Sequence, residues 1–82
     1  MVLIIENLGF MEKFRAEVTG IREMVWSSNG MEFETEAAAK EWLDGLSMRW
    51  FGFDLARVVP AETPRGEAVN FETDSIYLNF RK

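Results

Sequence analysis

Neither cysteine nor histidine occurs in this chain of 82 residues. Without cysteine there can be no disulfide and no thiolate-bound metal, which fits a cytoplasmic protein. Without histidine the chain lacks the side chain that titrates nearest to neutral pH and that most often binds transition metals. No spacing of serine and lysine indicates a pair that would replace them as a nucleophile and its base. The composition therefore predicts a protein that is not an enzyme and that uses no cofactor.

Long apolar runs are also absent from the sequence. The opening run, Met1 to Ile5, is too short for a signal peptide or a membrane span, and its β-branched residues are typical of a strand. Apolar residues make up 48% of the chain and charged residues 28%, a balance that excludes disorder. At this length we expect one compact domain over residues 1–82.

The net charge is −5, and the excess acid is concentrated in residues 31–46. Only Lys40 opposes the acids there, which are Glu32, Glu34, Glu36, Glu41 and Asp44. The simplest interpretation is a solvated acidic face, and the functional one is a docking surface for a protein with a basic surface. A field of this sign disfavours nucleic acid. The spacing does not match a calcium-binding loop, so we expect no metal site.

The dipeptide Asn29-Gly30 is the strongest short signal for a hairpin, since both residues accept the positive φ of a type I′ turn. We expect residues 22–28 to pair with residues 31–35, so that Trp26 lies opposite Phe33. The glutamates between them then point to solvent, because side chains alternate along a strand. Four residues are expected beneath the helix: Met24, Trp26, Met31 and Phe33.

An amphipathic helix is predicted over about residues 36–51. Thr35 is a good N-cap, and three alanines follow in the first turns. Gly52 is the preferred end of the helix. One apolar stripe with spacings of three and four residues is formed by Ala39, Trp42, Leu43, Leu46 and Trp50.

Further strands are predicted on both sides of this unit. Residues 14–19 alternate between apolar and polar, as a half-buried strand does. Residues 55–59 are either a short strand or an irregular crossover, and residues 60–66 form a loop. The tail is expected to be a hairpin that turns at Thr73-Asp74, with Phe71 opposite Ile76. The fold class is therefore α+β, an antiparallel sheet of about four to six strands built from hairpins, with the helix on one face and the other face mostly open.

The end of the helix carries a second candidate contact surface. Three aromatic side chains and a methionine lie so close together there that they cannot all face the core. The contact residues would be Arg49, Trp50, Phe51 and Phe53, whose composition is typical of interface centres. In the structural alternative, Trp50 and Phe53 belong to the core.

These features favour a non-enzymatic binding module that occludes a basic site on a partner macromolecule. Small inhibitors from phages and other mobile elements, anti-CRISPR proteins among them, share this size and charge, although no motif indicates such a family. One alternative is a self-associating structural domain that forms a homodimer by strand pairing. A weaker one is a nucleic-acid-binding accessory protein that uses Arg15, Arg22 and Arg81. We expect no membrane association.

Overall fold

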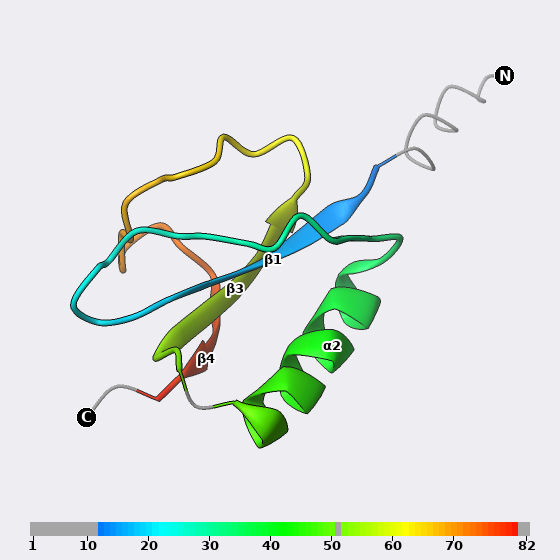
Figure 1. The fold of residues 1–82 in the computed structure, drawn as a ribbon. Coiled ribbons are helices and arrows are strands. Elements are labelled where there is room, and N and C mark those ends of the chain that lie inside the picture. The colour runs from blue at the N-terminus through cyan, green and yellow to red at the C-terminus, as the bar shows by residue number, and fades with distance from the viewer. Residues whose placement is uncertain (1–11, 51, 81–82) are drawn as a thin grey trace, which may run out of the picture.

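The computed structural model describes residues 12–50 and 52–80, so the strand expected near the N-terminus lies outside the described residues. The elements in chain order are β1 (Phe14–Thr19), β2 (Glu32–Phe33), α2 (Glu36–Arg49), β3 (Leu55–Pro60) and β4 (Ile76–Asn79). The described strands form one antiparallel sheet in the order β2-β1-β3-β4, and α2 packs against one face of it (Figure 1). The α+β class is confirmed, with a strand number at the low end of the expected range.

The hydrophobic core lies between α2 and the two central strands. Ala16 of β1 pairs with Val58 of β3, and these short side chains leave room for the helix. Ala39 and Leu43 of α2 are completely buried against them. The small residues on both sides let the helix and the sheet approach closely, so the core is compact despite the short chain.

The start of the helix is as the sequence predicts. Thr35 has extended backbone angles, and its hydroxyl accepts a hydrogen bond of 3.0 Å from the amide of Ala38. The helix ends at Arg49, earlier than the expected end near Gly52. Trp50 is already extended (φ −150°), although its amide still donates to the carbonyl of Leu46.

The hairpin expected at Asn29-Gly30 is wrong. Phe33 of β2 pairs with Phe14 of β1, and Gly30 has a positive φ (90°) whereas Asn29 does not. The Asn29 side chain instead accepts a hydrogen bond of 3.0 Å from the amide of Met31, which is a local turn that competes with a type I′ hairpin. Trp26 therefore does not lie opposite Phe33, and the connection from β1 to β2 spans residues 20–31.

The tail hairpin is also wrong. β4 pairs with β3 in the register Ala56 with Leu78, so Ile76 does not face Phe71. The chain turns over residues 70–74, where the amides of Thr73 and Asp74 donate to the carbonyl of Asn70. The residues before this turn lie along the first long connection instead, since Val25 and Ala68 form an isolated bridge.

The sheet face opposite α2 is covered rather than open, which corrects the sequence expectation. Residues 61–75 and the part of the first long connection around Trp26 lie over that face (Figure 1). Ser27 instead pairs with Val18 at the edge of β1. Two backbone hydrogen bonds of 2.9 Å join the two connections, from Trp26 to Glu67 and from Val69 to Met24. The polar side chains of β1 consequently point from the sheet into the loops that lie over it.

A bulge changes the pairing of β3 with β4. Arg57 pairs with Ile76 and Ala56 pairs with Leu78, which leaves Tyr77 as the extra residue on β4. The bulge lets Tyr77 and Leu78 both pack on the α2 side. Tyr77 thereby reaches the helix, where it contributes to the site described below.

Candidate functional site

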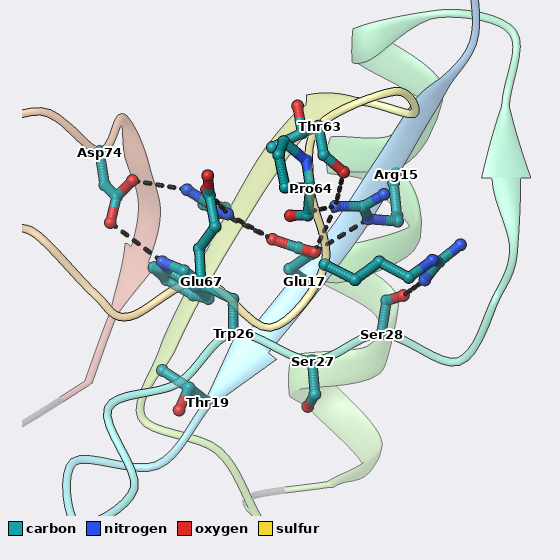
Figure 2. A network of polar contacts seen from close by, with 12 residues as sticks. Arg15, Glu17, Thr19, Trp26, Ser27, Ser28, Thr63, Pro64, Glu67 and Asp74 are labelled. Atoms are coloured by element: carbon teal, nitrogen blue, oxygen red, sulfur yellow. Dashed lines mark hydrogen bonds and ion pairs between the residues drawn. The ribbon is translucent and has the colours of Figure 1, made fainter.

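Charged residues of the central strands β1 and β3 are buried on the covered face, and Figure 2 shows Arg15 and Glu17 within their network. Arg15 and Glu17 of β1 are each only 1% exposed, and Arg57 of β3 is 3% exposed. The Glu17 carboxylate accepts hydrogen bonds from both arginines, at 2.9 Å from Nε of Arg15 and at 2.8 Å from Nε of Arg57. Alternation along β1 correctly separates these polar residues from the core residues, but their environment is not the solvent that the sequence suggests.

The network continues into the covering loops (Figure 2). Arg57 donates to Asp74 at 2.5 Å and to Glu67 at 3.1 Å, and its guanidinium lies 4.8 Å from the centre of the Trp26 ring. The Trp26 indole donates to the second oxygen of Asp74 at 2.9 Å. Arg15 donates to the carbonyl of Thr63 at 2.9 Å. Charge-assisted hydrogen bonds thus tie residues 61–75 to the sheet. Trp26, from the other long connection, joins the network through its ring contact with Arg57 and its hydrogen bond to Asp74.

The pKa values of Asp74 and Arg57 reflect this pairing. Burial acts to raise the pKa of Asp74, but hydrogen bonds from the Asn70 amide and the Trp26 indole, together with the charge of Arg57, outweigh it and hold the pKa below the ordinary value. Burial acts to lower the pKa of Arg57, yet its bonds to Glu17 and its other carboxylate partners raise it. Both groups are therefore charged at neutral pH.

The network is structural in character. In residues 12–50 and 52–80 every buried side-chain nitrogen and oxygen has a hydrogen-bond partner, so the network is satisfied within the protein. One sequence signal could have revealed the network: Arg57 interrupts the apolar run from Leu55 to Val59, and a charge in a central strand needs a buried partner.

All five residues of the predicted acidic face are exposed, but they lie in three places. Glu32 and Glu34 lie on and just after the edge strand β2, where Glu34 forms an ion pair of 3.5 Å with Lys13. Glu41 lies on the solvent side of α2. Two carboxylates face β4 instead, and these belong to Glu36 and Asp44.

Tyr77 of β4 forms a cluster with the charged side chains on the side of α2 that faces β4. The Tyr77 hydroxyl lies 2.9 Å from both carboxylate oxygens of Asp44, and this hydrogen bond raises the pKa of Tyr77 above 10.0. Lys40 lies between the two acids and forms an ion pair of 3.7 Å with Glu36. A cleft of about 150 Å³ opens here between α2 and β4. Its lining consists of Glu36, Lys40, Val58, Ser75, Ile76 and Tyr77.

The predicted aromatic surface divides between core and solvent. Phe53 is buried, as the structural alternative holds, whereas Trp50 is 47% exposed and Arg49 is exposed. The rings of Trp50 and Phe53 lie 5.5 Å apart, and Phe53 also contacts Phe80 at 5.9 Å. The remaining member, Phe51, lies outside the described residues.

Beside Trp50, an open apolar groove of about 270 Å³ separates α2 from residues 27–29. Trp42 and Leu46 form its helical wall, and Val18 lies among the residues that line it from β1. On the other side of the groove, Ser27 is held at the edge of β1 by an isolated bridge to Val18. The apolar stripe in the sequence contains Trp42 and Leu46 but does not show that they also line a groove.

No family model, curated protein or solved structure matches this chain. Within the part of the chain that the structure describes, there is no cluster of three or more acidic, histidine or cysteine side chains suited to a metal ion. A search of the same residues finds no helix with the length and apolar character needed to cross a membrane.

Proposed function

We propose that this protein is a non-enzymatic acidic binding module that occludes a basic site on a partner macromolecule. The observation that carries the proposal is the separation of its charges. Arg15 and Arg57 are withdrawn into the buried network, while all five carboxylates of residues 31–46 remain exposed. The accessible surface is thus depleted in cations, and it attracts a basic partner through a long-range field.

The same observation weighs against the nucleic-acid alternative. Arg15 donates to Glu17 and to loop carbonyls, so its guanidinium cannot reach a phosphate without breaking the network. By size and charge alone, the proposal extends to the small occluding inhibitors that phages and other mobile elements carry.

Co-purification from an extract of the native host tests the proposal. The double variant Glu32→Lys/Glu34→Lys reverses exposed charges of the acidic face, and Glu12→Lys/Glu72→Lys makes the same charge change at exposed positions outside it. A basic protein should be retained by the wild type and by the control, released by added salt, and lost with the first variant. Retention of the same proteins by both double variants would contradict the proposal.

Self-association is a second candidate function, favoured by the position of β4 at the edge of the sheet. Two copies could extend the sheet by pairing their β4 strands across a two-fold axis. The bulge at Tyr77 and the net charge of −5 on each copy both oppose this pairing. Light scattering over a range of concentrations decides the matter, because a strictly monomeric species removes the homodimer.

A further inference from the structure

The cleft between α2 and β4 has the components of a site for a cationic side chain. Val58 and Ile76 supply apolar contacts, the Tyr77 ring supplies an aromatic surface, and Glu36 supplies a carboxylate. A second carboxylate, that of Asp44, lies at the Tyr77 hydroxyl. An aromatic face combined with carboxylates and aliphatic contacts is chemistry that suits a cation with an extended apolar stem.

A cation of this protein already occupies part of the cleft. The ammonium of Lys40 lies 5.4 Å from the centre of the Tyr77 ring and 3.7 Å from a carboxylate oxygen of Glu36. Both side chains of this ion pair are substantially exposed, at 40% and 56%. Exposed pairs of this kind contribute little free energy, so a competing cation can displace Lys40 at small cost.

We propose that the cleft receives an arginine side chain of the partner, which takes the place of Lys40 over Tyr77. This inference rests on the proposed function, because it names the group by which a basic partner is held. Arginine fits better than lysine for two reasons. Its planar guanidinium stacks on an aromatic ring, and its paired N–H groups match the two oxygens of the Glu36 carboxylate.

The bulge in β4 supports a role for Tyr77 beyond packing. A regular register would have placed residues 77 and 78 on opposite faces of the sheet, whereas the bulge lets both pack on the helix side. Tyr77 then contacts Asp44 through its hydroxyl and Lys40 through its ring. Bulges are enriched where a side chain is redirected toward a functional site.

Titration with N-acetyl-arginine amide, followed by NMR of the backbone amides, tests the inference on the full chain. We expect saturable shifts at Ser75 and Ile76, which line the cleft. N-acetyl-citrulline amide has nearly the same shape without the charge and should produce no such shifts. N-acetyl-lysine amide should bind more weakly than the arginine compound.

Two lysine variants provide matched changes of charge. Lys40→Met removes the internal cation and should tighten the arginine compound by up to about five-fold, since an exposed ion pair no longer competes. Lys13→Met breaks a similar ion pair with Glu34 and should leave the affinity unchanged. Tyr77→Leu should abolish the shifts, whereas Tyr77→Phe keeps the ring and should retain them.

Shifts that are absent from both the wild type and Lys40→Met, or that are equal for arginine and citrulline, would overturn the inference. So would equal tightening by the two lysine variants, because that result indicates a general effect of net charge. These outcomes are separate from the co-purification test. A basic partner can still be lost with Glu32→Lys/Glu34→Lys when the cleft binds no arginine.

Discussion

Glu17 and Arg57 face each other across the two central strands, with Oε1 of the carboxylate 2.7 Å from Nη2 and 2.8 Å from Nε of the guanidinium. Neither side chain is more than 4% exposed. The pair lies on the sheet face that the sequence suggests is open. Arg57 also binds Asp74 and Glu67 in the connection formed by residues 61–75, so this pair joins the sheet to the loop that lies over it.

The Glu17–Arg57 pair should matter strongly for stability. Glu17→Gln leaves Arg15 and Arg57 buried with less compensating charge, and such a change costs about 3–5 kcal/mol of unfolding free energy. Urea denaturation measures the effect. The control, Glu34→Gln, removes one partner of an ion pair in which Glu34 is 86% exposed, and it should change stability by no more than about 0.5 kcal/mol. Similar small losses for both variants would show that the buried network is not needed for folding.

Stability should decline in acid through Asp74. Its pKa is lower in the folded protein than in the unfolded chain, so the stability it contributes is complete above the ordinary aspartate pKa and is lost as the pH falls through the folded value. The difference in unfolding free energy between the wild type and Asp74→Asn should be constant above about pH 5 and shrink below about pH 4. A difference that does not change between neutral pH and pH 3 would contradict this assignment.

Two glycines in and after α2 should respond in opposite directions to alanine. A Cβ at Gly52 would clash with the Trp50 ring, so Gly52→Ala must displace that ring from Phe53, at a cost of about 0.5–1.5 kcal/mol. A Cβ at Gly45 would meet only the flexible end of Arg49, at 3.3 Å. Gly45→Ala should therefore stabilise the helix by up to about 1 kcal/mol. Thermal unfolding of both variants tests this prediction. If both changes raised the unfolding temperature, or both lowered it, the positions of the Trp50 and Arg49 side chains would be contradicted.

Tyr77 is the only tyrosine of the chain, so its ionisation can be followed directly by phenolate absorbance. Its pKa should exceed the ordinary value of 10.0 because its hydroxyl donates to Asp44. Asp44→Asn should move the pKa back toward that value, whereas Glu41→Gln, an exposed change on the same helix, should have little effect. An unchanged titration in Asp44→Asn would rule out the hydrogen bond in solution.

The features that were predictable from the sequence are local. The N-cap at Thr35 and the helix that follows depend on neighbouring residues, and the alternation along β1 separates Ala16 from Glu17 correctly. The α+β class follows because one helix and several amphipathic strands have few ways to bury their apolar sides.

The pairings that failed are governed by contacts between distant residues. Trp26 does not pair with Phe33, because its indole donates to Asp74, which is 48 positions away in the chain. Asp74 in turn binds Arg57 and the Asn70 amide, so the turn forms over residues 70–74 and not as a hairpin at Thr73-Asp74. Turn propensities report only local preferences, and a buried charge network overrides them. The predicted acidic face divides for another non-local reason, because the packing of α2 on the sheet directs Glu36 and Asp44 toward β4.

The affinity of the co-purified partner for three forms of this protein tests the central claim most directly. Calorimetry at low and at moderate salt would compare the wild type with Glu32→Lys/Glu34→Lys and with the control Glu12→Lys/Glu72→Lys. We predict that reversal on the acidic face raises Kd by about tenfold or more and reduces its dependence on salt, while the control stays close to the wild type. Equal affinities for all three forms would contradict binding through this surface.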